Sequence, residues 1–183
     1  MNSPIDITGV ELVTPRLLLR PWREEDLADF HTYARVDGVG QPAGWLPHGS
    51  MDDTREILRR FIDRKRTFCL EYGGRAVGSL GVELYDASEF PELAESQGRM
   101  LGYVLAKDCW GQGLMPEAVS AATRWLFEDV RLDFLLLGYY AFNLRSARVA
   151  EKCGFRPIKR GSQAWLGEPL EDHVWTILWN PKR

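Results

Sequence analysis

The segment CWGQGLMPEA at residues 109–118 holds residue types whose spacing could do chemistry. Gly111 and Gly113 flank a glutamine, and glycine allows a positive φ or a close approach of the backbone to a ligand. The segment follows a strand-like stretch, and Pro116 suits the first turn of a helix. The first N–H groups of a helix lack backbone partners and, with the helix dipole, favour an anion. The segment therefore predicts an anion site, with a tight strand-to-helix turn as the simpler alternative.

The two common nucleotide-binding patterns do not describe this segment. The dinucleotide fingerprint GxGxxG would need a third glycine where the sequence has Pro116, and no Gly-Lys-Ser/Thr run follows as in a P-loop. A phosphate bound here must therefore be held by a different arrangement of backbone groups.

The overall composition disfavours several classes of function. With 23 basic against 26 acidic residues and a net charge of −3, the chain lacks the basic surface that neutralises nucleic-acid phosphates. A cationic or amine-bearing substrate stays open. The N-terminus shows no basic start followed by an apolar run, and the longest apolar stretch, FLLLGYYAF, is far shorter than the ~20 residues of a membrane span. We expect a cytoplasmic protein that binds neither nucleic acid nor membranes.

The cysteines and histidines suggest neither a metal site nor a covalent mechanism. The cysteines, at positions 69, 109 and 153, are odd in number and form no CxxC pair, which fits a reducing compartment. The histidines at positions 31 and 173 form no recognisable constellation with a nucleophile. We therefore expect no metal ion and no Ser-His-Asp or Cys-His catalysis.

Apolar periodicity predicts a mixed α/β chain around a single sheet. At 183 residues and 45% hydrophobic, the sequence fits one well-filled core, so we expect one domain over residues 1–183. The predicted order is β-α-α-β-β-β-α-β-α-β-β. The strands are expected at 16–22, 67–72, 76–86, 98–106, 132–142, 155–165 and 172–180, and the helices over 24–35, after Ser50, after Pro116 and over 143–154.

Local signals support these boundaries. Ser50 with Asp53 forms a candidate capping box, Asn143 is a natural N-cap, and Gly154 is a natural helix stop. The apolar run at 132–142 is typical of a strand covered on both faces.

Two segments together resemble a known family. VLAKDCWGQGLMPEA (104–118) is followed about thirty residues on by NLRSARVAEKCGF (143–155), and this pair resembles the GNAT acetyltransferase superfamily. More narrowly, the start TPRLLLRPWREEDL and the stretches GSLG and LGYVL are similar to the ribosomal-protein N-terminal acetyltransferases, the RimJ/RimL-like branch. The resemblance spans residues 12–180.

The resemblance implies a single-domain α/β GNAT fold: a mixed, mostly antiparallel central sheet with splayed central strands, flanked by helices. Acetyl-CoA, the implied cosubstrate, would enter a V-shaped opening between 99–106 and 133–142. The family's cofactor contacts carry over to Tyr103, Val104 and Leu105 for the pantetheine, to Trp110, Gly111, Gln112, Gly113, Leu114 and Met115 for the pyrophosphate, and to Asn143 and Ser146 at the thiol end. The chain departs from the family signature at both ends, with Trp110 in a polar slot and Met115 in a small-residue slot. Because these contacts come mainly from the backbone, we expect binding to survive.

Acetyl transfer from a thioester to an amine needs oxyanion donors, a departing thiolate and a neutral amine. Backbone N–H groups near Val104 could serve the oxyanion, and a thiolate with a pKa of about 8.5 needs little help from an acid. Relatives often use a tyrosine seven residues after the asparagine, where this chain has Ala150. Ser146 is the nearest substitute and Tyr140 the second, although a helix-start serine and a core tyrosine are the simpler interpretations.

The base is harder to assign. Met100 occupies the slot where relatives often carry a glutamate, which leaves Glu83 as the best carboxylate on a central strand. Without a dedicated base, the substrate should be an amine that is already partly neutral. An α-amine, with a pKa of about 7.7–8.0, is neutral to roughly a tenth at pH 7, whereas a lysine or polyamine near 10.4 is neutral to well under a thousandth. A protein or peptide N-terminus is therefore the favoured acceptor.

Trp45, His48 and Glu83 are the candidate acceptor-binding residues, with the acidic stretch 86–95 beside them. The alternatives are a small-molecule amine such as a polyamine or an aminoglycoside, and a GNAT module that binds acyl-CoA without catalysis. Exposed sheet edges leave a homodimer open, with tryptophans near the C-terminus as its contacts, at positions 165, 175 and 179.

Overall fold

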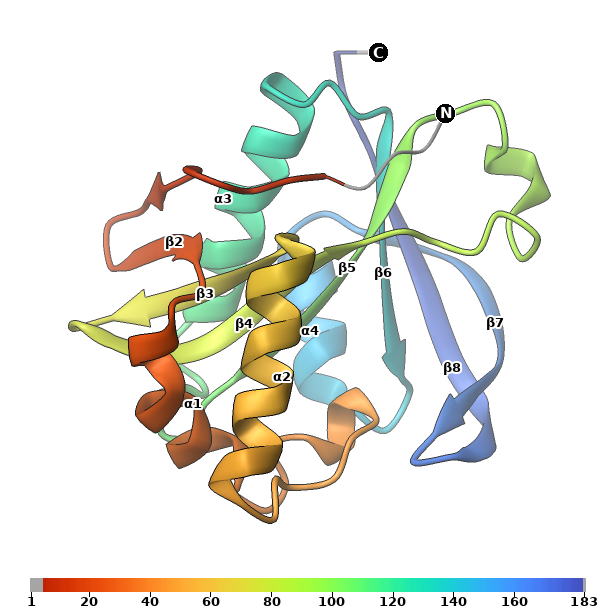
Figure 1. Ribbon diagram of the computed structural model, residues 1–183. Coiled ribbons are helices and arrows are strands. Elements are labelled where there is room, and N and C mark those ends of the chain that lie inside the picture. Colours follow the sequence, from red (N-terminus) through yellow and green to blue (C-terminus); the bar gives the residue numbers. More distant parts are fainter. Residues whose placement is uncertain (1–4, 183) are drawn as a thin grey trace.

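One eight-stranded sheet organises the computed structural model, which describes residues 5–182. Its strand order is β1-β2-β3-β4-β5-β6-β8-β7, and all neighbours are antiparallel except β5 and β6 (Figure 1). The strands are β1 Leu12–Val13, β2 Leu17–Pro21, β3 Thr67–Tyr72, β4 Arg75–Glu83, β5 Gly98–Leu105, β6 Phe134–Tyr140, β7 Arg156–Trp165 and β8 Glu168–Trp179. The predicted fold class is confirmed.

Helices cover both faces of the sheet. α1 and α2 lie side by side on one face, and α3 and α4 lie on the other (Figure 1). Their bounds are α1 Leu27–Ala34, α2 Met51–Arg64, α3 Leu114–Glu128 and α4 Leu144–Lys152. The predicted order of elements holds, with β1 added as a two-residue strand and with short 3-10 turns, at 24–26, 41–43, 91–93 and 107–109. No helix within residues 5–182 combines the length and apolar character needed to cross a bilayer.

The predicted helix caps are present. Ser50 Oγ accepts the Asp53 N–H at 3.1 Å while the Asp53 carboxylate accepts the Ser50 N–H at 2.8 Å, so the capping box is complete. The Asn143 side chain accepts the Ser146 N–H at 3.2 Å. Both helices therefore begin where the sequence predicts, and the second cap fixes the entry to the site described below.

β6 is buried on both faces, as its apolar run predicts. Leu135 and Leu137 pack into the larger core, which includes α3. Phe134 and Leu136 point to the other face, into a smaller core that includes Phe90 of the loop between β4 and β5. Successive side chains of a strand alternate between faces, so one strand serves two hydrophobic cores.

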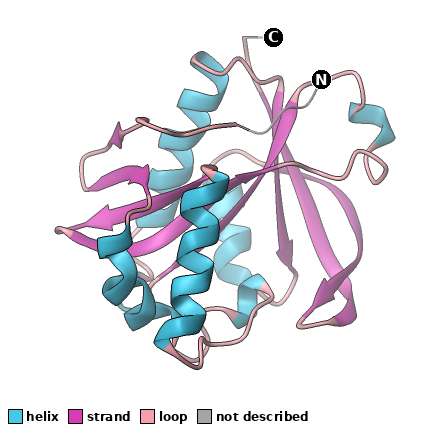
Figure 2. Cartoon of the chain, in the orientation of Figure 1, coloured by secondary structure: helices cyan, strands magenta, loops and turns pink. Residues whose placement is uncertain are grey.

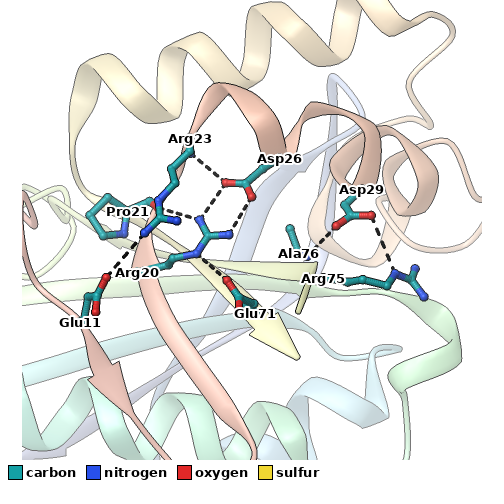
Figure 3. A network of polar contacts seen from close by, with 9 residues as sticks. All are labelled: Glu11, Arg20, Pro21, Arg23, Asp26, Asp29, Glu71, Arg75 and Ala76. Carbon is teal, nitrogen blue, oxygen red and sulfur yellow. Dashed lines mark hydrogen bonds and ion pairs between the residues drawn. The ribbon is translucent and has the colours of Figure 1, made fainter. Parts of the chain in front are cut away.

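A buried ion pair ties the N-terminal strands to the first helix (Figure 3). Arg20 on β2 is 4% exposed, and its Nη1 and Nη2 donate to the two carboxylate oxygens of Asp26 at 2.8 and 2.7 Å. Its Nε donates to Glu71 of β3 at 2.7 Å. The hydrogen bond with Asp26 outweighs burial and raises the pKa of Arg20. The bidentate geometry holds β2, β3 and the start of α1 in one arrangement.

Candidate active site

The parallel strands β5 and β6 separate after a short ladder. They pair from Gly98 opposite Phe134 to Leu101 opposite Leu137, after which β5 continues to Leu105 and β6 to Tyr140. Figure 2 shows the two strands diverging from their shared start. A cavity of about 670 Å³ occupies the resulting opening. The expected V-shaped gap between the central strands is present.

Strand alternation decides which backbone groups of β5 face this gap. The Ala106 N–H donates to the Val77 carbonyl of β4 at 2.7 Å, and Val104 lies opposite Ser79. In an antiparallel ladder, every second residue directs both its N–H and its C=O to the same neighbouring strand. Val104 lies two residues before Ala106, so its N–H and C=O also point to β4. The N–H and C=O of Tyr103 and the N–H of Leu105 point into the opening. The backbone groups of β5 that are free to meet a ligand in the opening thus belong to Tyr103 and Leu105, while Val104 is one of the lining residues.

The glycine segment adopts the conformation that its sequence predicts. Gly111 has φ 78° and Gly113, the N-cap of α3, has φ 77°. A Cβ added to Gly111 would meet nothing within 4 Å, so this glycine is needed for its backbone angle and not for room. The cavity lining includes Trp110, Gly111, Gly113, Leu114 and Met115. Gln112 is turned outward: its side-chain Nε2 donates to the Asp108 carbonyl at 3.0 Å.

A polar cluster that the sequence did not reveal holds this loop from behind. Arg16 Nη1 donates to the Gln112 carbonyl at 2.8 Å, and its Nε donates to Glu117 at 2.7 Å. Thr14 Oγ1 donates to the same carboxylate at 2.6 Å. Burial would raise the pKa of Glu117, but the hydrogen bonds from Thr14 and Arg16 outweigh it and lower that pKa. The turn between β1 and β2 therefore fixes the start of α3.

α4 presents a basic face to one end of the cavity. Arg145, Arg148 and Lys152 line it, and the Arg145 guanidinium lies 4.3 Å from the centre of the Trp110 ring. Residues spaced i, i+3 and i+7 share one side of a helix, so this face could have been found in the sequence. Together with the N–H groups at the start of α3, it makes this end suited to phosphate groups.

Two hydroxyl groups meet at the middle of the opening. Ser146 is 7% exposed, and its Oγ lies 2.8 Å from Tyr103 Oη. Burial raises the pKa of Tyr103, so its phenol keeps its proton at neutral pH. The Asn143 Nδ2 donates to the Pro42 carbonyl at 3.2 Å, which links α4 to the loop before α2. The structure thus brings Asn143, Ser146 and Tyr103 together at the cavity.

Glu83, the expected carboxylate, lines the cavity in an ion pair. Its Oε2 lies 2.7 Å from Arg66 Nε, and its side chain is 40% exposed. Glu83 stands opposite Met100 on β5, and Met100 lines the same cavity. The carboxylate therefore lines the cavity with a guanidinium already beside it.

Acidic side chains of the loop between β4 and β5 extend this end. Asp86 and Glu89 line the cavity. Hydrogen bonds from the Ser88 hydroxyl and backbone N–H lower the pKa of Asp86, and Glu89 lies 3.6 Å from Lys159 Nζ. Among the described residues, the lining does not extend to the other two acidic side chains of the loop, Glu92 and Glu95.

Tyr140 lines the cavity with its hydroxyl already bonded. Its Oη donates to the Ala164 carbonyl of β7 at 2.5 Å, and its ring stacks on Phe142 with centroids 5.6 Å apart. Burial raises the pKa of Tyr140. The phenol is thus directed to β7, whereas Ser146 is partnered by Tyr103.

Trp45 and His48, expected at the acceptor end, lie outside the cavity lining that residues 5–182 define. The His48 N–H donates to the Ala34 carbonyl at 3.1 Å, and its Nδ1 lies 2.9 Å from Oγ1 of the buried Thr54. Burial lowers the pKa of His48. Trp45 packs against His48 with ring centroids 5.2 Å apart. The two rings hold the loop against α1 and α2, and the loop reaches the cavity instead through Val39, Pro42 and Ala43.

His173 on β8 also lines the cavity, and no motif around it predicts this position. No group of three or more His, Cys, Asp or Glu side chains within residues 5–182 is arranged to hold a metal ion.

Comparison with known proteins identifies the family. The acetyltransferase (GNAT) domain model matches residues 16–156. The protein described as "Probable N-acetyltransferase YjcK" from Bacillus subtilis (strain 168) is 34% identical over 88 residues. That match covers 46% of this chain and 48% of that protein, so it spans about half the length of the relative.

Solved structures share the architecture over nearly the whole chain. The GNAT-family acetyltransferase from Bacillus anthracis matches with a TM-score of 0.81 and 19% identity, covering 93% of this chain and 99% of that one. The ribosomal-protein-S5-alanine acetyltransferase from Vibrio fischeri has a TM-score of 0.70, 20% identity and coverage of 94% and 98%. The spermidine N-acetyltransferase from Vibrio cholerae, solved with CoA and spermine, has a TM-score of 0.74, 17% identity and coverage of 92% and 98%. These likenesses concern the fold, and with the domain match over most of the sequence they show that the chain belongs to the GNAT family of acetyltransferases.

Proposed function

We propose that this protein transfers an acetyl group from acetyl-CoA directly to a primary amine, and that the acceptor is the N-terminal α-amine of a protein or peptide. The observation that carries the proposal is the polarity of the cavity. One end combines the N–H groups of the glycine segment with Arg145, Arg148 and Lys152, and the other carries Glu83, Asp86 and Glu89. An anionic donor and a cationic acceptor would meet where β5 and β6 separate.

The donor fits the residues of the opening. The pyrophosphate would lie against the N–H groups of residues 110–115 and the basic face of α4. The amides of the pantetheine arm would pair with the free backbone groups of Tyr103 and Leu105, as an added strand pairs with a sheet edge. Asn143 would border the arm, and its side chain keeps α4 capped. The thioester would then reach Ser146.

Direct transfer forms the bond between the amine nitrogen and the carbonyl carbon while the carbon–sulfur bond breaks. The amine nitrogen loses one proton and the departing thiolate takes one. The hydroxyl pair of Ser146 and Tyr103 would supply the thiolate's proton, and solvent would return the proton lost by the nitrogen to that pair. Tyr140 would shape the acceptor side, since its own hydroxyl is bonded to Ala164. No covalent enzyme intermediate is needed.

The preference for an α-amine rests on the state of Glu83. Because Arg66 Nε lies 2.7 Å from Oε2 of this carboxylate, that oxygen is already engaged by a guanidinium. An amine that is roughly a tenth neutral at pH 7 needs no strong base, whereas a polyamine does. A polyamine is the second candidate, and the observation that favours it is the acidic pair Asp86 and Glu89 on the lining.

Thiol release from acetyl-CoA across a panel of amines tests the proposal. The panel holds short peptides with different first residues, spermidine, an aminoglycoside and free amino acids. We expect the highest kcat/KM with a peptide α-amine. Faster acetylation of spermidine would overturn the acceptor assignment. Stabilisation by CoA without thiol release for any amine would favour a non-catalytic acyl-CoA-binding module.

We further infer that residues 1–183 act as one domain in the cytoplasm, which the free thiols of Cys69, Cys109 and Cys153 support. A homodimer would use the exposed face of Trp179, which is 51% exposed. Trp175 is 3% exposed in the smaller core and has no surface to offer.

A further inference from the structure

His173 occupies an unusual position on the wall of the cavity. It lies on β8, opposite Tyr140 of β6 and Gly161 of β7. Its side chain is 7% exposed and lines the cavity. A side chain that is nearly buried in the protein yet borders an open cavity faces whatever fills that cavity.

The His173 Nδ1 is buried without a hydrogen-bond partner among the described residues. An unsatisfied buried polar atom costs about 1–3 kcal/mol, so it calls for an explanation. Two other buried atoms in this state, on Trp22 and Thr123, belong to residues away from the cavity lining. His173 differs from them because it lines the cavity, and its other ring nitrogen, Nε2, is not among these buried atoms and is the one that a cavity ligand could contact.

The surrounding residues hold the imidazole at the point where the central strands separate. Its ring lies edge-on to Trp175 and Tyr140, with centroids 4.3 and 5.0 Å apart. A Cβ on Gly138 would lie 2.5 Å from His173 Cε1 and 3.1 Å from Nε2. Gly138 directly follows Leu137, the last β6 residue paired with β5. The glycine in an otherwise bulky strand therefore makes room for this imidazole.

The ring is neutral at physiological pH. Burial lowers the pKa of His173 to about 4. The groups in ring contact with it are aromatic, Tyr140 from β6 and Trp175 from β8. Phe90 from the loop and Lys159 from β7 lie against the Trp175 ring. The nearest acidic lining is on the loop, at Asp86 and Glu89. A neutral imidazole can accept a proton or a hydrogen bond from an amine.

We propose that His173 is a catalytic residue that binds the acceptor amine through Nε2 and takes the proton it loses. The proposal rests on the proposed acetyl transfer. As the nitrogen–carbon bond forms and the carbon–sulfur bond breaks, the nitrogen gives one proton to the imidazole. The thiolate gains one proton from the Ser146–Tyr103 pair, and solvent relays the imidazole's proton back to that pair. The products are an amide and a free thiol, and His173 is neutral again.

Replacement of His173 tests this role. His173→Gln keeps a hydrogen-bonding group of similar reach but removes the basic nitrogen, and His173→Asn serves as a second variant if the first is unstable. General bases contribute about 10²–10⁴-fold, and a weakly basic imidazole belongs at the low end. We expect kcat to fall about 10²-fold with the best amine of the panel, while the rise in Tm on adding CoA is unchanged. The matched control is His31→Gln, whose Nδ1 contacts Thr54 away from the cavity, and it should keep kcat within twofold.

Wild-type kcat/KM in both His173 variants would overturn the proposal. A second readout separates it from failure of the proposed function. The His173 imidazole ¹⁵N resonances, identified by their loss in His173→Gln, should shift when an N-terminal peptide is added to the CoA complex. If wild-type protein releases no thiol but these resonances shift, His173 binds amines and the transfer assignment fails. If they do not move, His173 is not an acceptor contact, whatever the activity.

Discussion

The hydroxyl groups of Tyr103 and Ser146 lie 2.8 Å apart and join β5 to α4 across the opening. One residue belongs to the strand that would hold the donor's arm, and the other to the first turn of the helix beside the thioester. In the proposed mechanism, the pair would take the place of a tyrosine that the family resemblance puts seven residues after the asparagine. In this chain that position is Ala150, which is buried in the core.

Removing either hydroxyl should slow thiolate departure. We expect Ser146→Ala and Tyr103→Phe each to lower kcat by about 10²-fold at most, the low end for general acids, because a thiolate leaves readily. The double variant should lose little more than either single variant, since one proton path is removed once. Steady-state thiol release measures this. Ser162→Ala, on exposed β7, is the control, and fully additive losses would contradict a shared path.

The polar cluster of Thr14, Arg16 and Glu117 should govern the affinity for CoA and not the rate of the chemical step. Arg16→Ala removes the hydrogen bonds to Glu117 and to the Gln112 carbonyl, which frees the start of α3. We expect the Kd for CoA to rise about tenfold, equal to ~1.4 kcal/mol, with kcat nearly unchanged. Calorimetric titration with CoA measures the change. The control is Arg23→Ala, which loses a 3.6 Å ion pair with Glu11 away from the cavity lining. This variant should bind CoA as the wild type does.

The buried pair of Arg20 and Asp26 should dominate the mutational sensitivity of the N-terminal half. Asp26→Asn leaves a buried guanidinium without its bidentate partner, at a cost of about 3–5 kcal/mol in the free energy of unfolding. The exposed pair of Arg60 and Glu56 should cost about 0–1 kcal/mol when Arg60 becomes alanine. Urea denaturation compares the two. Equal losses would show that the buried geometry carries no special weight.

Stability should decline in mild acid because His173 is buried in its neutral form. Its pKa is lowered to about 4 in the folded protein and is about 6.5 in the unfolded chain. The unfolded state therefore binds more protons in this window, and the free energy of unfolding falls by up to about 1.4 kcal/mol per pH unit from 6.5 to 4. Burial lowers the pKa of His48 as well, with the same sign. Urea titrations at several pH values should show a shallower decline for His173→Gln than for His31→Gln.

Residues whose structure is set by their neighbours in sequence were predictable. The capping box at Ser50, the N-cap at Asn143 and the positive φ angles of Gly111 and Gly113 follow from local backbone needs. The apolar run of β6 likewise required a strand covered on both faces. These features together fixed the order of elements and the location of the opening.

Residues whose roles depend on distant partners were not predictable. Arg16 meets Gln112 only because the turn between β1 and β2 folds over the start of α3. His173 reaches the cavity because β8 pairs with β6 and Gly138 leaves room. Trp45 and His48 looked available as loop residues, yet His48 contacts buried Thr54 and Trp45 packs on His48. The spacing of Arg145, Arg148 and Lys152 along α4 is a signal that the sequence does carry.

The four-pair ladder between β5 and β6 has a mechanical consequence. The ladder joins strands β1–β5 of the sheet to strands β6, β8 and β7. It pairs β5 with β6 only up to Leu101 and Leu137, so the two strands are joined at one end of the opening. Beyond those residues the strands can move apart or together without breaking a rung between them. A ligand that enters the opening beyond this ladder therefore displaces no backbone pairing between β5 and β6.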